Sequence, residues 1–198
     1  MAIMLTRRRL LSGGVAGLVS GPLARPARAQ AVLGDDGLYH QPWFLESFLD
    51  LADDLRAAGA HGRRLAILWE LRGCPFCKRL HQVNFADAAV SQYIRKNFDI
   101  LQLNIIGARE VTDFDGERLS EKSFAAKYGV YSTPMVQFFG ETAETLAGKP
   151  PAEREVLRMK GYVPPEEFRR TFAFVAERAY AGTDLETYLD RPAPRGGE

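Results

Sequence analysis

Two cysteines that are separated by two residues are the part of this sequence best suited to chemistry. Cys74 and Cys77 are the only cysteines among the 198 residues. This count excludes a scaffold of several disulfides and a four-cysteine zinc or iron–sulfur site within one chain. Such a pair can close into a disulfide and can exchange that disulfide with another protein. Redox chemistry at this pair is therefore the first hypothesis.

The residues around the pair predict which cysteine reacts first. An apolar run of strand length at 65–71 leads into the pair, and a helical pattern begins directly after it. The N-terminus of a helix carries unpaired N–H groups and partial positive charge, which favour a thiolate at Cys74. Pro75 suits the first helical position because it lacks an N–H group. We therefore predict that Cys74 is the nucleophile and that the more buried Cys77 resolves the mixed disulfide.

The elements that would position the pair alternate between helix and strand. In the first half of the chain, the predicted helices lie at 44–55, 78–86 and 88–97, and the predicted strands lie at 65–71 and 98–105. This order favours a sheet with parallel neighbours and with helices on its faces.

The second half of the chain predicts two more strands and a closing helix. The predicted elements are a hairpin at 109–118, a short helix at 120–128, strands at 135–139 and 155–160 joined by a polar loop at 140–154, and a helix at 164–179. The sequence D-F-D-G at 113–116 resembles the start of a calcium loop. The spaced ligands and the terminal glutamate of such a loop do not follow it, so calcium binding is not expected.

The first 29 residues predict an export signal. Arginines at 7–9 precede an apolar stretch at 10–24, and Ala27 and Ala29 give the A-x-A pattern of a signal-peptidase site. The arginines resemble a twin-arginine signal. Glycines and a proline interrupt the apolar stretch, which is too short to favour a permanent membrane anchor. We therefore expect a periplasmic protein that is exported with a cleaved N-terminal signal.

The mature chain is predicted to be one domain of ordinary size. We assign residues 30–182 to this domain, including an N-terminal helical extension, and residues 183–198 to a disordered tail. The 26 Lys and Arg residues nearly balance the 25 Asp and Glu residues, so a strongly basic surface for nucleic acid is not expected. Thiols in the periplasm meet an oxidising environment. The pair would therefore be disulfide-bonded or kept reduced by a dedicated electron supply.

Two motifs together resemble the thioredoxin fold. The sequence G-C-P-F-C-K at 73–78 follows a predicted strand, and Thr133-Pro134 precedes a later one. The resemblance covers about residues 64–179 and implies an α/β fold with a central mixed sheet flanked by helices. It also implies a cis peptide bond before Pro134, which would expose the Thr133 backbone to an extended substrate. The substrate-binding residues implied in this way are Thr133, Pro134, Pro75 and Phe76. Phe76 would add an apolar contact surface or only cover the pair.

Longer stretches of the sequence indicate a subfamily. Residues 69–81 (W-E-L-R-G-C-P-F-C-K-R-L-H), with 84–87 and 111–116, are most similar to the periplasmic SoxW-type thioredoxins of sulfur-oxidising bacteria. This resemblance implies a thiol-disulfide oxidoreductase that reduces partner-protein disulfides in a sulfur-oxidation (Sox) system. It implies a disulfide-containing periplasmic protein as substrate and a membrane thiol carrier of the CcdA or DsbD type as electron donor. No cofactor is implied, and a monomer is expected.

The sequence departs from thioredoxin at the group that accepts a proton from the resolving cysteine. Thioredoxin has a buried aspartate six residues before the first cysteine, where this chain has Leu68. Glu70 lies two residues further along the same predicted strand, and it is a candidate proton acceptor if it is buried. The alternative is a glutamate at the end of the strand that faces solvent.

Three interpretations of His81 and two alternative functions stay open. His81 lies four residues after Cys77 on the same helical face, so it could tune the thiols, bind a metal or pack in the helix. The first alternative function is a Dsb-type disulfide oxidase or isomerase, because one sequence does not give the direction of electron flow. The second is a metal-binding chaperone that uses Cys74, Cys77 and His81.

Overall fold

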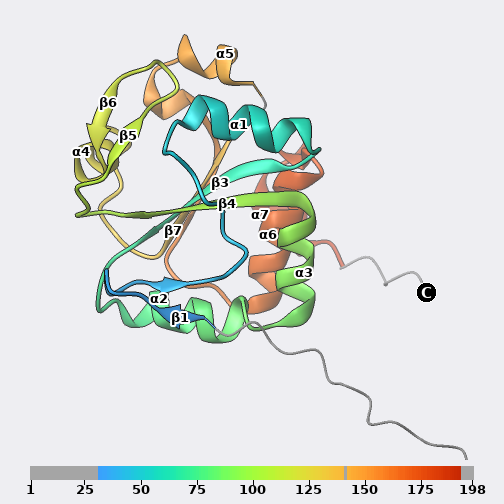
Figure 1. Cartoon of the computed structure of the whole chain (residues 1–198). Coiled ribbons are helices and arrows are strands. Elements are labelled where there is room, and N and C mark those ends of the chain that lie inside the picture. The colour runs from blue at the N-terminus through green and yellow to red at the C-terminus, as the bar shows by residue number, and fades with distance from the viewer. Residues whose placement is uncertain (1–30, 141, 193–198) are drawn as a thin grey trace, which may run out of the picture.

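The computed structural model describes residues 31–140 and 142–192, so the predicted export signal at 1–29 lies outside the described residues. Its centre is a four-stranded sheet with the strand order β4–β3–β7–β8 (Figure 1). The strands are β3 (Arg64–Glu70), β4 (Phe98–Asn104), β7 (Met135–Phe139) and β8 (Glu155–Lys160). β3 is parallel to β4, whereas β7 is antiparallel to both β3 and β8. The predicted mixed sheet is therefore confirmed.

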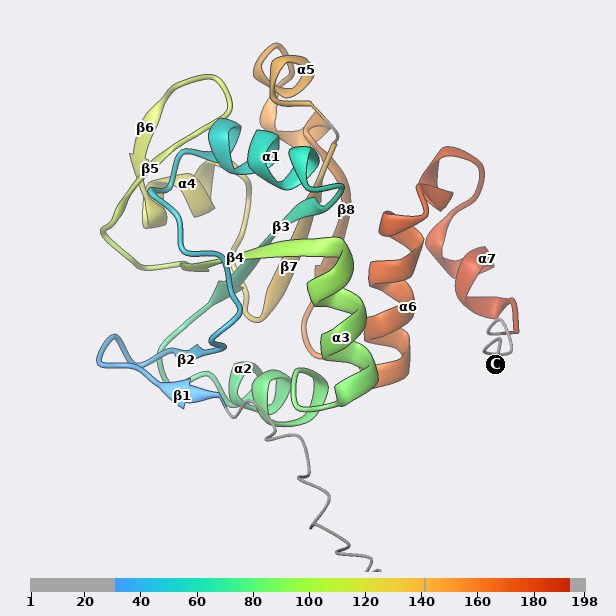
Figure 2. The ribbon, with the colours of Figure 1, turned by 45° about the vertical axis from the view of Figure 1, so that its right-hand side comes forward.

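Helices cover both faces of this sheet (Figures 1 and 2). One face carries α1 (Leu51–Ala60), α4 (Glu121–Lys127) and α5 (Ala143–Ala147). The other face carries α2 (Pro75–Arg79), its π-helical continuation (Leu80–Asn84), α3 (Ala88–Asn97) and α6 (Pro165–Ala176). None of the helices in the described part of the chain is long and apolar enough to cross a membrane.

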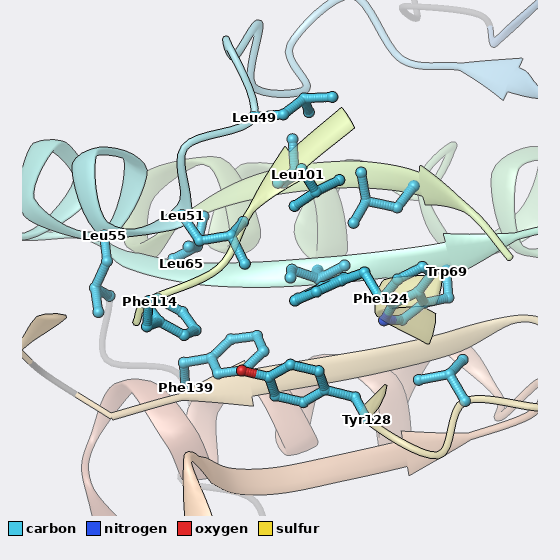
Figure 3. Packing of buried hydrophobic residues seen from close by; sticks show 14 of the residues in the cluster. Leu49, Leu51, Leu55, Leu65, Trp69, Leu101, Phe114, Phe124, Tyr128 and Phe139 are labelled. Carbon is cyan, nitrogen blue, oxygen red and sulfur yellow. The ribbon is translucent and has the colours of Figure 1, made fainter. Parts of the chain in front are cut away.

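The alternation of side chains along β3 explains the two layers. Ile67 and Trp69 point into the core under α1, while Ala66 and Leu68 point into the opposite core. All four are fully buried, as the apolar sequence of this strand predicts. Figure 3 shows the first core, in which Trp69 stacks on Phe124 with 5.6 Å between the ring centroids. The strand that leads into the cysteines is thus held on both faces.

The helix predicted at 44–55 begins later, at Leu51. Asp50 is its N-cap, and the Asp50 carboxylate accepts a hydrogen bond from a backbone N–H of the first turn. Leu49 has a positive φ of 62°, through which a right-handed helix cannot continue. Phe48, whose spacing suggested a buried helical face, is fully exposed. The predicted helix before β3 is therefore present, but it starts seven residues later than predicted, and residues 31–50 are not helical.

Residues 31–50 instead form an extended segment, which we call the strap. It opens with a hairpin of β1 (Val32–Leu33) and β2 (Tyr39–His40), and this hairpin lies beside α2 in both views (Figures 1 and 2). The chain then follows the outer edge of β4, where the N–H of Leu45 donates to the carbonyl oxygen of Ile100 at 2.8 Å. The first part of the strap therefore lies at the end of β3 from which the cysteines follow.

Several later elements have the predicted positions. α3 and β8 match the predictions at 88–97 and 155–160 residue for residue. The predicted hairpin is present as β5 (Glu110–Thr112) and β6 (Arg118–Ser120). Ser120 caps α4, as its position before a helical pattern predicts.

Two later predictions differ from the structure. The loop predicted at 140–154 contains α5, because Thr142 supplies an N-cap by accepting a hydrogen bond from a backbone N–H of the first turn. The tail predicted from residue 183 contains α7 (Leu185–Asp190). α7 packs on α6, with 5.3 Å between the ring centroids of Tyr188 and Phe174. The described domain therefore extends past the predicted boundary.

Asp54 on α1 makes the stability of this fold depend on pH. Burial raises the pKa of its carboxyl to about 6, against the lowering effect of a hydrogen bond from Ser47 Oγ at 2.6 Å. The negative charges of Asp50, Asp53 and Asp99 add to the rise. In the unfolded chain the pKa is about 3.9, so the folded state binds the proton more tightly. The stability that comes from this tighter proton binding is fully present below about pH 4 and is lost as the pH rises through about 6.

We expect Asp54→Asn to raise the free energy of unfolding near pH 7.5 by about 1 kcal/mol, a value already reduced for the partial exposure of the carboxyl. The gain should shrink below about pH 5, where the wild-type carboxyl is protonated in the folded state. Urea unfolding of both proteins between about pH 4 and 8 measures this difference. Asp35→Asn is the control, because Asp35 is an exposed aspartate of the strap and is not among the charges that raise the pKa of Asp54. Identical pH dependence in the wild type and Asp54→Asn would contradict the assignment.

Candidate active site

The Cys74–Cys77 disulfide lies where a strand ends and a helix begins. β3 ends at Glu70, and the chain turns at Gly73, whose φ of 75° is readily adopted by glycine. Cys74 is the N-cap of α2, and its sulfur accepts a hydrogen bond from the N–H of Cys77 at 3.1 Å. Pro75 lies in the first turn of α2, where a backbone N–H has no partner within the helix. The missing N–H of proline therefore costs no hydrogen bond there. The Cα atoms of the bonded cysteines are 5.3 Å apart.

The two sulfurs of this disulfide differ in exposure. Cys77 is only 3% exposed, whereas Cys74 is half-buried. A partner protein can therefore approach Cys74 but not Cys77. The order of reaction that the sequence predicts, with Cys74 as nucleophile and Cys77 as resolving thiol, requires such a difference.

The Thr133–Pro134 turn lies against Cys74. The peptide bond between Thr133 and Pro134 is cis, the form that the resemblance implies. The Thr133 carbonyl oxygen lies 3.7 Å from Cys74 Sγ. β7 starts directly after this turn and is antiparallel to β3, so the start of β7 and the end of β3 meet at one edge of the sheet. Pro134 is buried and Thr133 is half-buried, so Thr133 is the residue of this turn that is open to solvent.

Two large apolar side chains next to these motifs are exposed. Phe76, between the two cysteines, is 54% exposed, and Tyr131, two residues before Thr133, is 79% exposed. Pro75 is exposed as well. Exposed apolar groups beside a reactive sulfur are candidates for contact with a partner. Sequence analysis singled out Phe76 and missed Tyr131, although an aromatic residue so close to the Thr-Pro motif was a visible signal.

Glu70 is buried at the end of β3, with 1% of its surface exposed. It follows Leu68 on the same face of the strand and therefore points toward the helical turn that carries His81. His81 Nε2 lies 3.0 and 3.1 Å from the two carboxylate oxygens, and the side-chain amide of Gln102 donates a further hydrogen bond. The alternative of a glutamate that faces solvent is therefore wrong.

A cavity of about 10 Å³ is bordered by Glu70 and by the cysteines of the disulfide. Its lining includes Glu70 and both cysteines, together with Leu38 and Tyr39 of the strap. A water molecule needs roughly 10–15 Å³ of such space, so the cavity has the size of one water. Glu70 and Cys77 thus border the same small space, and the strap helps to enclose it.

His81 is buried between Glu70 and the strap, with 1% of its surface exposed. Its Nδ1 lies 3.2 Å from the side-chain amide nitrogen of Gln41, so both ring nitrogens have partners. Within residues 31–140 and 142–192, no group of three or more His, Cys, Asp or Glu side chains is placed to hold a metal ion. The metal-binding alternative therefore lacks His81 as a third ligand beside Cys74 and Cys77.

A family model and several solved structures are similar to this chain. A family model described as a thioredoxin-like domain matches residues 51–176, whereas no curated protein matches the chain. A thioredoxin-fold protein from Helicobacter pylori is 19% identical with a TM-score of 0.53, over 65% of this chain and 83% of its own. A thioredoxin from Thermus thermophilus is 24% identical with a TM-score of 0.46, over 62% and 81% of the two chains. The oxidised C-terminal domain of DsbD from Neisseria meningitidis is 14% identical with a TM-score of 0.41, over 62% and 90%.

Proposed function

Because this chain belongs to the thioredoxin-like domain family, we propose that it is a thiol-disulfide oxidoreductase that reduces disulfides in partner proteins. The observation that carries this proposal is the disulfide at the start of α2. In it, a half-buried Cys74 is bonded to a buried Cys77. An accessible nucleophile next to a protected resolving thiol is the arrangement that two-step disulfide exchange needs.

The reaction proceeds in two exchanges. In the first, the Cys74 thiolate attacks one sulfur of the partner disulfide, and the other partner sulfur leaves as a thiolate. In the second, the Cys77 thiolate attacks Cys74 Sγ and displaces the remaining partner sulfur. The partner disulfide gains two electrons, and the Cys74–Cys77 disulfide forms. Cys77 must lose its proton before the second exchange, because the thiolate is the nucleophile.

Glu70 is the group that we propose accepts the Cys77 proton. It is buried, it borders the cavity that Cys77 also borders, and that cavity has the size of one water molecule. A carboxylate within reach of a thiol through one water can act as a general base. Glu70 would therefore do the work that a buried aspartate two residues earlier on the same strand face does in thioredoxin.

The turn at Thr133 and the residues between the cysteines are proposed to hold the substrate. The Thr133 backbone lies beside Cys74 Sγ and can pair with an extended partner segment, as the edge of a sheet does. Pro75 and Phe76, which lie between the two cysteines in the sequence, present exposed apolar surface. Pro134 is buried next to Thr133, and the peptide bond between them is cis.

The setting that we propose is the periplasm, in a sulfur-oxidation system. The support is the resemblance of residues 69–81 to SoxW-type thioredoxins and the predicted export signal at 1–29. The substrate would be a disulfide-containing periplasmic protein. Each cycle leaves the Cys74–Cys77 disulfide, so a reductase needs an electron donor, for which we propose a membrane thiol carrier of the CcdA or DsbD type.

The reduction potential of the Cys74–Cys77 pair tests this proposal. We expect a value near the thioredoxin end of the scale, about −270 mV, because a reductase must form its own disulfide readily. The measurement is a titration of the full chain against a defined thiol-disulfide buffer, followed by trapping of free thiols. A value near about −120 mV would contradict a reductase and favour a Dsb-type oxidase. A pair that does not equilibrate with the buffer would contradict both functions.

A further inference from the structure

A row of polar side chains leads from the cavity beside the disulfide to the strap. The cavity beside Cys77 is bordered by Glu70, whose carboxylate meets His81 Nε2, and His81 Nδ1 meets the side chain of Gln41. Glu70 and His81 are each 1% exposed, and Gln41 is 4% exposed. Gln41 lies outside residues 51–176, to which the family model corresponds. The row therefore ends on a residue that the strap adds to the family domain.

The hydrogen bonds fix how protons are arranged in this row. An amide nitrogen can only donate, so Gln41 Nε2 donates to His81 Nδ1, which must carry a lone pair. The proton of the neutral ring then lies on Nε2 and is donated to the Glu70 carboxylate. The side-chain amide of Gln102 supplies a second donor to Glu70. Two donors therefore fix the direction of the Glu70 carboxylate.

One buried polar atom of this row makes no hydrogen bond. The side-chain oxygen of Gln41 is buried and has no hydrogen-bond partner. If the Gln41 amide turned over, this oxygen would accept a hydrogen bond from a protonated Nδ1, and the ring form that donates at Nδ1 and also at Nε2 is the imidazolium. In that state Nε2 still donates to Glu70, but the positive ring cancels the negative charge of the carboxylate. The orientation of Gln41 thus decides whether Glu70 faces a neutral ring or a cation.

We propose that His81 is a positioning residue that directs the ionised Glu70 toward Cys77, and that Gln41 keeps the His81 ring neutral so that Glu70 can accept a proton. This inference rests on the proposed function, because it assigns a role to Glu70 in disulfide exchange. It makes the strap a part of the redox site. Removing the His81 ring, or forcing it to be cationic, should weaken Glu70 as a base while leaving Cys74 unchanged.

The other groups around Glu70 and His81 are consistent with this assignment. The rings of Tyr39, Phe44 and Phe85 lie 5.9, 5.7 and 5.3 Å from the His81 ring centroid, so its surroundings are mainly aromatic. Besides Glu70, the titratable groups among these neighbours and around the cavity are the Tyr39 phenol, Cys74 and Cys77.

On the β4 side, Arg109 donates to the backbone oxygen of Gln102 at 3.0 Å. Arg109 also pairs with Glu121 at 2.6 Å. Its charge therefore has a carboxylate partner of its own and is not needed to balance Glu70.

The two exchanges can be followed separately with dithiobis(nitrobenzoate) as the probe. The reduced full chain attacks this aromatic disulfide through Cys74 and releases one coloured nitrothiolate, and Cys77 then displaces the second from Cys74. We expect His81→Leu to slow the second release about tenfold near pH 7 and to move its half-maximal rate up by about one pH unit. The first release should keep its rate, and near pH 9 the second should recover because Cys77 then ionises without a base.

Two further variants separate positioning from structure. His81→Gln can still donate one N–H to Glu70, so it should restore most of the second-release rate. Gln41→Glu places a carboxylate against Nδ1 and stabilises the imidazolium, so it should slow the second release in the presence of His81 but add nothing to His81→Leu. His61→Leu is the matched control, because His61 is an exposed histidine at the end of α1, and it should change neither release.

The outcomes distinguish this inference from the proposed function. If the wild type releases one nitrothiolate and no second, the dithiol cycle of the proposed function fails. If both releases occur but the pH profile of the second is the same in the wild type, His81→Leu and Gln41→Glu, the roles of His81 and Gln41 are overturned. Equal slowing of both releases in His81→Leu, without rescue by His81→Gln, would also overturn them, because that is the result of general structural damage.

Discussion

Cys77→Ser is expected to accumulate as a mixed disulfide with its protein substrate, whereas Cys74→Ser is expected to lose all disulfide reductase activity. Cys74 is the sulfur that solvent reaches, so it makes the bond to the partner. Cys77 is 3% exposed and lies directly behind it, so without the Cys77 thiol nothing displaces the partner again. Incubation of each reduced variant with a disulfide-containing protein such as insulin, followed by a non-reducing gel and mass spectrometry, measures the trapped species.

The control for this experiment is Cys74→Ser/Cys77→Ser, which should form no covalent complex with the same substrate. The partner should also be joined to residue 74 when the trapped species is digested and sequenced. Disulfide reduction at the wild-type rate by Cys74→Ser would contradict the assigned roles. So would a covalent complex of Cys74→Ser with the substrate through Cys77.

The fold around the cysteines could be predicted because local signals decide it. The continuous apolar run of β3, a proline after Cys74 and a capping residue before each of α3 and α4 act within a few residues. These signals do not depend on distant parts of the chain. The bounds of α3 and the order of strand, cysteine pair and helix therefore follow from the sequence.

The strap could not be predicted, because its path depends on contacts far along the chain. Phe44, Phe48 and Leu51 have helical spacing, yet Phe48 is fully exposed and Leu49 adopts a left-handed backbone conformation. The strap instead takes its hydrogen bonds from the edge of β4, for example at Ile100. Spacing of apolar residues cannot distinguish a helix face from an extended segment that contacts two different surfaces.

The same limit applies to the site. The alternation along β3 places Glu70 on the face of Leu68, but whether that face is covered at its end depends on His81 and on the strap. Gln102 gave a weak signal as a polar residue in an apolar strand, whereas Gln41 gave none. The cysteines and the Thr133–Pro134 turn could be named in advance, but the surroundings of Glu70 could not.

A second buried polar cluster lies far from the cysteines in sequence and stabilises the loop at 113–117. Asp113 is 1% exposed and accepts hydrogen bonds from Arg154 Nη1 at 2.8 Å and from Tyr128 Oη at 2.7 Å. Lys127 Nζ bonds Asp113 and also reaches Asp115 at 3.0 Å and Glu117 at 2.7 Å. The ammonium group of Lys127 therefore lies among the carboxylates that gave this loop its resemblance to a calcium site.

Burial of the Tyr128 ring and the adjacent Asp113 carboxylate both raise the pKa of Tyr128 above its usual range, while Arg154 opposes them. The phenol therefore stays protonated at neutral pH and donates its hydrogen bond to Asp113. Arg154 is 3% exposed, and its positive charge is balanced by the carboxylates of Asp113 and Asp115. Removal of Asp113 would leave a buried guanidinium and a buried phenol without their shared acceptor.

Asp113→Ala is therefore expected to lower the free energy of unfolding by about 3–5 kcal/mol, the range for a buried ion pair that loses one partner. Asp115→Ala is the matched control: it removes a carboxylate from the same loop, but this side chain is 31% exposed, so its loss should cost about 1 kcal/mol or less. Urea unfolding of the reduced and oxidised proteins measures both values. Equal losses in the two variants would contradict the assignment, because Asp113 would then contribute no more than a surface charge. A larger loss for Asp113→Ala, in the oxidised as in the reduced protein, is the result that a buried cluster independent of the disulfide requires.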